Sequence, residues 1–276
     1  VKNVISSNYV HTSKLYKSFV GLVNEIRPKV FVMENVPGLI RLFGGKVKEQ
    51  VLYDFSSLGY RVKVQQLSSD DYGVPQQRKR VFFVGVNDEK ISKKNEFEFP
   101  KAEYGDGMKP YVTCKEAISD LDFVPDDVSL GENIAYKIPA QSEYQNLMRK
   151  GSHSIKNHSI TIHKEQTKKI IAMVPDGGNY KDLPIELQNT RKVHIAWTRM
   201  NSEKPCFTID TGHNHHFHYK ENRVPTVRES ARIQSFPDKF EFIGTKTSQL
   251  KQVGNAVPPL MAEAIAKQVI NLIREE

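Results

Sequence analysis

Apolar residues recur at helical spacing near the start of the chain. The segment "SKLYKSFVGLVNEI" (13–26) places apolar side chains three to four residues apart, and Arg27-Pro28 ends the pattern. We expect a helix whose buried face consists of Leu15, Phe19, Leu22 and Ile26. The apolar run Val30–Met33 follows directly and predicts a short buried strand.

The same alternation of helix and strand continues to about residue 90. "KVKEQVLYDFSSLGY" predicts a second helix that ends at Gly59, with Val47, Val51, Leu52, Phe55 and Leu58 along one face. Tyr60, Val62 and Val64 alternate as in a strand, and "RVFFVGV" is a second apolar strand. Helices that alternate with short apolar strands favour a parallel α/β sheet with crossover connections.

The periodicity fades between Asn95 and Val224, where Pro, Gly, Asn and His interrupt short segments. The helical pattern then returns in "TVRESARIQSF", which begins with capping chemistry, and in Leu260–Ile273 after Pro258 and Pro259. We therefore predict three ranges: 1–94 as α/β sheet, 95–224 as an irregular domain, and 225–276 as a return to the sheet domain.

Composition indicates a globular protein with a basic surface. The formal net charge is +8, and residues 146–224 hold 13 Lys/Arg against 7 Asp/Glu, or +6 of that excess, with eight of the nine histidines. This segment indicates either a loop-rich surface that faces phosphates or an ordinary solvated face. The sequence has no apolar run of about 18 residues and no signal-peptide pattern at its start.

A carboxylate follows the first predicted strand. In "KVFVMENVPGL", Glu34 comes directly after the apolar run, and an unpaired carboxylate is costly to bury. Gln76, Arg78 and Arg80 alternate as they enter the later strand, so we expect them on one side of it. A carboxylic acid and a guanidinium on adjacent strands could bind the polar edge of a planar heterocycle; a solvated strand end beside a surface basic cluster is the alternative.

Four segments carry a family resemblance. "FVMENVPGL", "DYGVPQQRKRVFFVG", "TVRESARIQSFPDKF" and "QVGNAVPP", in this order, resemble signature motifs of the DNA (cytosine-5) methyltransferases. "GGNYKDLP" and "KPCFTID" resemble their target-recognition region. The resemblance implies a partial Rossmann-like class I methyltransferase sheet plus an irregular target-recognition domain. It also implies S-adenosylmethionine as methyl donor and double-stranded DNA as substrate.

The resemblance also implies roles for individual residues. In this family a cysteine thiolate adds to C6 of a flipped cytosine, and C5 then takes the methyl group. Glu34 would bond N3 and the exocyclic amine, with its pKa raised by the apolar strand, and Asn35 would brace the loop around it. Arg80 would lie near O2, while Arg78 and Gln76 would support the catalytic loop and the DNA backbone.

Further residues follow from the other motifs. Asn255, Ala256 and Val257 in "GNAVPP" would lie at the methyl-donor pocket. The segment Arg228–Gln234 would be scaffold, and Arg228, His215 and His216 are candidate DNA contacts. The histidines of "GHNHHFHY" lack a nearby cysteine or acidic pair, so we expect no metal there.

Two family motifs are missing. Residues 1–33 contain no cysteine and only one glycine, Gly21, so neither the Gly-rich cofactor loop nor the Pro-Cys nucleophile motif precedes Glu34. Cys206 in "KPCFTID" lies in the recognition segment, and Cys114 lies at a predicted helix start; we expect both to act as small apolar side chains. The chain therefore resembles the C-terminal portion of a methyltransferase, as one subunit of a split enzyme, a truncated product or a fragment left after cleavage. We expect it to be inactive alone, and either to bind an N-terminal complement chain that carries the missing motifs or to self-associate.

The expected function is DNA cytosine-5 methylation within a bacterial restriction–modification system, in the cytoplasm at the nucleoid. Two alternatives stay open: a catalytically inactive DNA-binding or regulatory relative, and an RNA cytosine-5 methyltransferase.

Overall fold

The computed structural model describes residues 7–122, 133–188, 197–211 and 216–274, with the side chains of 7–14 left out. Contacts divide the chain into two compact units. The first unit comprises Val1–Leu67, Lys79–Lys101 and Ala264–Glu276, and the second comprises Ser68–Arg78 and Ala102–Glu263. This division differs from the predicted ranges, because 68–78 and 225–263 belong to the second unit.

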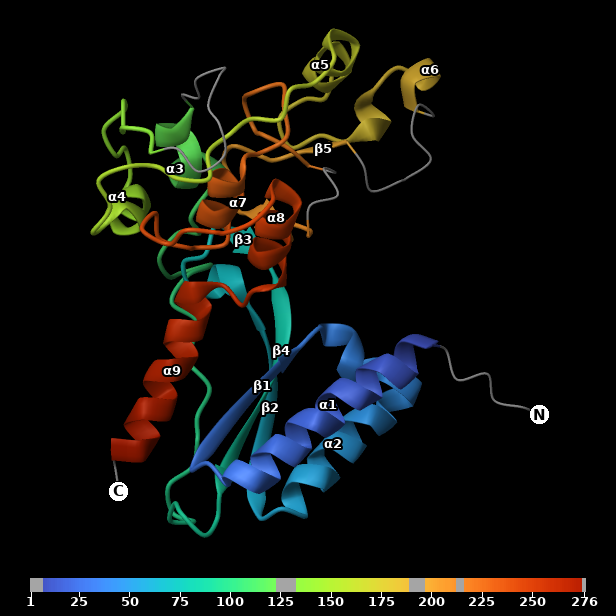
Figure 1. Cartoon of the computed structure of the whole chain (residues 1–276), viewed down its shortest axis with the longest axis vertical. Coiled ribbons are helices and arrows are strands. Elements are labelled where there is room, and N and C mark those ends of the chain that lie inside the picture. The colour runs from blue at the N-terminus through green and yellow to red at the C-terminus, as the bar shows by residue number, and fades with distance from the viewer. Residues whose placement is uncertain (1–6, 123–132, 189–196, 212–215, 275–276) are drawn as a thin grey trace, which may run out of the picture. The chain divides into compact units, whose positions relative to one another are not determined.

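Helices and strands alternate in the first unit, as the sequence predicts. In chain order they are α1 (Ser7–Ile26), β1 (Val30–Asn35), the 3-10 segment η1 (Pro37–Gly45), α2 (Lys46–Ser56), β2 (Tyr60–Ser68) and β4 (Lys79–Asn87). The strands form one sheet in the order β1-β4-β2, and α1 and α2 lie side by side over it (Figure 1). The predicted α/β architecture is confirmed.

The predicted parallel direction of this sheet is wrong. β1 pairs with β4 in antiparallel register, from Val30 opposite Val86 to Asn35 opposite Val81. Backbone hydrogen bonds from Ser69 to Arg78 and from Asp88 to Gly59 join the opposite ends of β2 and β4 in the same way. A parallel neighbour needs a crossover of a dozen or more residues, and the short connection between β2 and β4 does not provide one.

The core of the first unit lies between the sheet and its two helices. Phe31 and Met33 of β1 pack with Val51 and Phe55 of α2, and the Phe31 and Phe55 rings are 4.2 Å apart. The predicted buried face of α1 is largely wrong, because Leu15, Leu22 and Ile26 are 68%, 51% and 62% exposed. Tyr16 and Val23 are buried instead, with Phe19 and Val20 partly buried beside them. Apolar residues at helical spacing occur on two sides of α1, so the sequence pattern does not show which side is buried. Packing against the sheet and α2 buries the side with Tyr16 and Val23.

The second unit is built from short elements, as expected for an irregular domain. They are η2 (Ser69–Tyr72), β3 (Gln76–Gln77), α3 (Cys114–Ile118), η3 (Ser119–Leu121), α4 (Glu143–Arg149), α5 (Glu165–Ala172), η4 (Tyr180–Asp182), α6 (Ile185–Gln188), β5 (Thr198–Arg199), β6 (Cys206–Phe207), β7 (His216–Phe217), α7 (Val227–Ile233) and α8 (Lys246–Asn255). Two small parallel pairs, β3-β6 and β5-β7, replace a continuous sheet.

Helix α7 is buried along its whole length. The predicted capping is confirmed: Thr226 accepts from the Glu229 amide, and the Glu229 side chain accepts from the Thr226 amide. Arg232 bonds the carboxylates of Asp120 and Asp238, and all three side chains are fully buried. Paired charges of this kind fix the position of a helix that has no exposed face.

The last helix, α9 (Pro259–Arg274), begins at a proline, as the sequence predicts. Met261, Ile265 and Leu272 are buried, which gives the helix one apolar face at helical spacing. Among the helices of the described residues, none has the length and apolar character that crossing a bilayer requires.

Candidate functional site

Glu34 and Arg80 are brought together by the antiparallel pairing of β1 and β4. Glu34 lies opposite Phe82, so Arg80 is its diagonal neighbour on the adjacent strand. The Arg80 Nε lies 2.7 Å from the Glu34 Oε1, and the side chains are 13% and 28% exposed. The Arg80 Nη1 also donates to the Lys79 carbonyl at 2.8 Å. The result is a partly exposed carboxylate and guanidinium held side by side.

Burial and pairing with Glu34 shift the pKa of Arg80 in opposite directions. Desolvation lowers the pKa of Arg80 and is the larger effect, while the nearby Glu34 raises it. The guanidinium stays charged at neutral pH, since its ordinary pKa is far above 7. A charged arginine at this distance favours the ionised form of Glu34, which opposes the effect of the apolar strand. The expected rise in the pKa of Glu34 stays a prediction.

Asn35 turns its side chain onto the backbone that follows Glu34. Its Oδ1 accepts a hydrogen bond from the Val36 amide at 2.9 Å, directly before η1 begins at Pro37. This contact is of the kind that bracing the Glu34 loop requires, and the role of Asn35 itself stays a prediction.

Gln76 and Arg78 lie in the interior of the second unit. Gln76 belongs to β3, Arg78 follows it, and Arg80 belongs to the separate strand β4, so the three residues do not alternate along one strand. Gln76 is 0% exposed and Arg78 is 1% exposed. The Arg78 Nη2 donates to the Gly254 carbonyl at 2.6 Å. Both polar groups are thus used within the protein, and their predicted roles at the catalytic loop and on DNA stay untested.

The segment after Gly254 presents one polar side chain beside two small apolar ones. Asn255, the last residue of α8, is exposed, and Ala256 and Val257 are half-buried. A Cβ on Gly254 would lie 2.4 Å from the Asp210 carbonyl oxygen, so only glycine fits there. The predicted contact of Asn255, Ala256 and Val257 with S-adenosylmethionine stays a prediction.

Two candidate DNA contacts are described by the structure. Arg228 is fully buried and donates to the carbonyls of Lys156 (3.0 Å), Pro237 (3.2 Å) and Phe240 (2.6 Å), which is the environment of a scaffold residue. His216 is half-buried in β7, with its ring 4.2 Å from the ring of Phe207. His215 lies outside the described residues. The DNA contacts of all three stay predictions.

The two cysteines lie against each other in the second unit. Cys114 is 0% and Cys206 is 1% exposed, and their side chains are hydrogen-bonded. Burial is the main reason that the pKa of the Cys206 thiol is raised well above its usual value. A buried, protonated thiol is a poor nucleophile. This environment agrees with the expectation that neither cysteine is catalytic.

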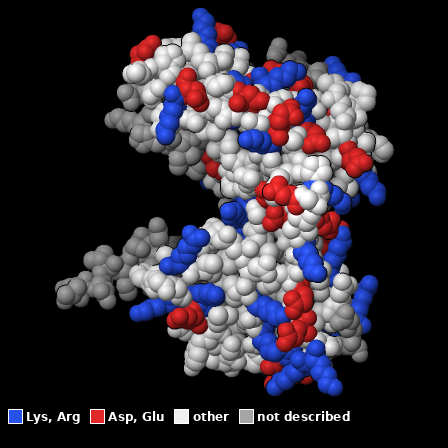
Figure 2. Space-filling model, turned by 180° about the vertical axis from the view of Figure 1, so that it is seen from behind, with Lys and Arg blue, Asp and Glu red and all other residues white. Residues whose placement is uncertain are grey.

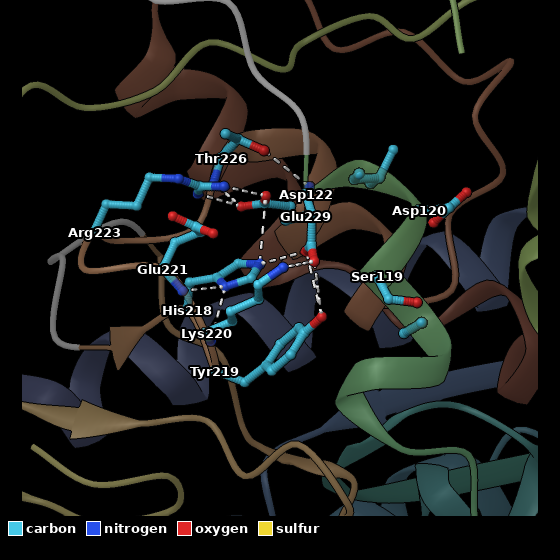
Figure 3. A network of polar contacts seen from close by, with 12 residues as sticks. Ser119, Asp120, Asp122, His218, Tyr219, Lys220, Glu221, Arg223, Thr226 and Glu229 are labelled. Atoms are coloured by element: carbon cyan, nitrogen blue, oxygen red, sulfur yellow. Dashed lines mark hydrogen bonds and ion pairs between the residues drawn. The ribbon is translucent and has the colours of Figure 1, made fainter. Parts of the chain in front are cut away.

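A buried polar network surrounds His218, and no sequence motif had predicted it (Figure 3). His218 Nδ1 accepts from the amides of Lys220 (3.1 Å) and Glu221 (3.0 Å), so in the neutral ring Nε2 carries the proton. That nitrogen lies 3.7 Å from Glu229 and 3.8 Å from Asp122. Burial lowers the pKa of His218 to about 4. Glu229 connects this network to the predicted cap of α7, so the capping pattern is the one sequence feature that pointed to a member of the network.

His218 was one of the histidines weighed as a metal ligand, and it is instead an uncharged member of this network. The described residues contain no group of three or more His, Cys, Asp or Glu side chains arranged to hold a metal. Basic and acidic side chains are interspersed over the face in Figure 2, which shows no continuous basic surface. Both interpretations of the basic segment, a phosphate-facing surface and an ordinary solvated face, therefore stay predictions.

Comparisons with known proteins agree on one family. Residues 7–271 match the family model described as C-5 cytosine-specific DNA methylase. The chain is 36% identical over 262 residues to the Type II methyltransferase M1.HphI of Haemophilus parahaemolyticus, covering 95% of this chain and 62% of the relative. It is 33% identical to the Type II methyltransferase M.NgoFVII of Neisseria gonorrhoeae, covering 95% and 63%. The chain thus spans somewhat over three fifths of the length of these relatives.

Solved structures agree on the fold. A putative DNA modification methyltransferase encoded within an E. coli prophage superposes with a TM-score of 0.71 at 25% identity, covering 95% of this chain and 74% of that one. The Dnmt2 methyltransferase of S. pombe superposes with a TM-score of 0.50 at 12% identity, covering 95% and 73%. The second likeness concerns the fold alone.

Proposed function

Because this chain belongs to the C-5 cytosine-specific DNA methylase family, we propose that it supplies the cytosine-binding and target-recognition part of a DNA cytosine-5 methyltransferase. The observation that carries the proposal is the pairing of Glu34 with Arg80 on adjacent strands. Both relatives compared above are Type II methyltransferases of bacteria, so we place the activity in a restriction–modification system acting on the bacterial nucleoid.

The chemistry of this pair matches the pairing edge of cytosine. That edge presents an acceptor at O2, an acceptor at N3 and a donor at the exocyclic amine. Arg80 donates to O2, and Glu34 accepts from the amine and holds a proton at N3. The edge becomes accessible only when the base leaves the stack. When a nucleophile adds to C6, negative charge develops on the ring, and the proton at N3 together with Arg80 stabilises it.

The methyl donor is assigned to the segment after Gly254. Asn255 would bond a polar group of S-adenosylmethionine, and Ala256 and Val257 would contact its apolar surface. S-adenosylmethionine supplies the methyl group that C5 receives. The nucleophile must come from elsewhere, because Cys114 and Cys206 are the chain's two cysteines and both are buried.

We therefore propose that a further N-terminal part carries the Pro-Cys nucleophile and the Gly-rich cofactor loop. The described sheet leaves β1 at its edge, and α1 exposes Leu15, Leu22 and Ile26 on one side. Unpaired strand edges and contiguous apolar surfaces favour association. More than a third of the length of M1.HphI lies outside its match to this chain, which leaves room for such a segment.

Methyl transfer tests the proposal. The chain is mixed with DNA and labelled S-adenosylmethionine, with and without a complement segment taken from a relative's N-terminal part. We expect incorporation only in the mixture, and a reduction of at least about 100-fold in Glu34→Gln. Glu49→Gln, at an exposed position of α2, is the matched control and is expected to be unchanged. Transfer by the chain alone would refute the inactivity, and labelling of RNA in preference to DNA would refute the substrate.

A further inference from the structure

Three hydrogen bonds within the second unit fix the backbone of residues 254–260, called the methyl-donor segment below. The Arg78 Nη2 donates to the Gly254 carbonyl (2.6 Å), the Gln234 Nε2 donates to the Ala256 carbonyl (2.7 Å), and the Leu260 amide donates to the Ser235 Oγ (3.2 Å). The carbonyls of residues 254 and 256 are therefore fixed inward. The residue between them, Asn255, is exposed.

The amide orientation of Gln234 is set by a second buried glutamine. The Gln76 Nε2 donates to the Gln234 Oε1, which leaves the Gln234 Nε2 to donate to Ala256. The Gln76 Oε1 accepts from the Ile209 amide at 3.1 Å, in the segment that resembles the recognition region. Both glutamines are 0% exposed. A single chain of bonds thus runs from Ile209 through the two glutamines to Ala256.

We propose that Gln234 is a positioning residue which, oriented by Gln76, fixes the backbone that presents Asn255 to the methyl donor. This inference rests on the proposed function for the identity of the ligand, while the bonds themselves do not depend on it. It also gives Gln76 a role inside the protein in place of the predicted contact with DNA. The Gln76 Nε2 also faces the Ile233 carbonyl at 3.4 Å, so only acceptors lie at its amide nitrogen, and the donors and acceptors along this chain of bonds keep one direction.

A matched pair of variants tests the proposal. Gln234→Met keeps the length of the side chain and removes both hydrogen bonds. Gln145, in α4, is the control residue because it is also 0% exposed. Its side chain donates to the Ser119 Oγ (2.9 Å) and accepts from the Gln141 amide (2.6 Å). Gln145→Met therefore removes the same kinds of bond at a position away from the methyl-donor segment.

The first measurement is amide hydrogen exchange in the full chain. We expect exchange of the amides of residues 253–257 to accelerate about fivefold or more in Gln234→Met, the effect of losing one net hydrogen bond, with α5 as an unchanged internal reference. Gln145→Met is expected to leave the exchange of 253–257 within twofold of the wild type. Equal acceleration in both variants, or none in Gln234→Met, would overturn the proposal.

The second measurement separates substrate binding from turnover in the chain mixed with its complement segment. We expect the KM for S-adenosylmethionine to rise about tenfold in Gln234→Met and in Gln76→Met, with kcat and DNA affinity within twofold of the wild type. Loss of DNA affinity in Gln76→Met with normal exchange would return Gln76 to the DNA surface. If the wild-type mixture does not methylate DNA, the proposed function fails, and the exchange measurement still decides the positioning role.

Discussion

Arg80 donates from its Nε to the Oε1 of Glu34 over 2.7 Å, which joins the end of β1 to the start of β4. The guanidinium is planar and holds several donors in fixed directions, whereas an ammonium is a compact point charge. The pair therefore depends on the shape of Arg80 as well as on its charge.

Replacing Arg80 by lysine tests this dependence. We expect Arg80→Lys to reduce kcat/KM for DNA methylation about 10- to 100-fold in the mixture with the complement segment, because charge is kept but directed donation is lost. Steady-state kinetics measure the change. Arg41→Lys, at an exposed position of η1, is the control. Equal activities of the two variants would contradict a directed contact with the base.

The apolar side of α1 predicts association. We expect Leu22→Lys to weaken binding of the complement segment at least tenfold, because a charge is placed at the centre of the Leu15–Leu22–Ile26 stripe. Isothermal titration calorimetry gives the affinity. Leu147→Lys changes an equally apolar residue that is 46% exposed on α4 and should have no effect. A wild-type chain that stays monomeric and does not bind the segment would contradict this interface.

The buried cluster of Arg232, Asp120 and Asp238 predicts a large loss of stability. Arg232→Met removes the cation between two buried carboxylates, and Asp120 then keeps only Arg149, and Asp238 only the hydroxyl of Tyr136, among the strong contacts. We expect the free energy of unfolding to fall by about 3 kcal/mol. Lys156→Met breaks the more exposed pair with Glu241 and should cost no more than about 1 kcal/mol. Urea denaturation followed by circular dichroism compares the two. Similar losses would show that burial of the charges is not what matters.

His218 predicts a loss of stability on mild acidification. Its pKa is lowered from 6.5 to about 4, so below pH 6.5 the unfolded chain binds a proton that the folded chain does not. The free energy of unfolding should therefore fall by about 2 kcal/mol from this group between pH 7 and pH 5. Burial is the main cause of this low pKa; among the neighbouring charges, Arg223 and Arg199 lower the pKa further, whereas Glu229 and Asp122 raise it.

Urea denaturation at both pH values tests this expectation. His218→Asn cannot take up a proton in this range, so its loss of stability on acidification should be smaller than that of the wild type by about the same 2 kcal/mol. The comparison uses the change with pH in each protein, so a lower starting stability of the variant does not affect it. Equal slopes in the two proteins would show that His218 is not the group responsible.

Gly254 predicts a steric effect. A Cβ there would lie 2.4 Å from the Asp210 carbonyl oxygen and 3.0 Å from the Thr211 Cα, so Gly254→Ala should destabilise the chain by about 1–3 kcal/mol. Gly21→Ala is the opposite case, because nothing lies within 4 Å of its Cβ and the residue is inside α1. That variant should stabilise the chain by about 0.5–1 kcal/mol. Thermal denaturation shows whether the two changes have opposite signs.

The sequence by itself determined the local elements and the family. Helix α2 and its buried residues, the Thr226–Glu229 cap and the start of α9 at Pro259 follow from spacing and capping rules that act over a few residues. The motifs identified the family, and they pointed to Glu34 and Arg80 as residues on adjacent strands.

Tertiary structure alone decided the rest. The antiparallel direction of β4, the choice of Tyr16 and Val23 over Leu15 and Leu22, and the burial of Gln76 all depend on segments distant in the chain. Alternation along a strand predicts which face of the sheet a side chain occupies, but it does not predict which residues that side chain contacts. The Gln76 side chain forms hydrogen bonds with Ile209 and Gln234, which lie 133 and 158 residues later in the chain. A pattern over a few neighbouring residues cannot predict contacts at that separation.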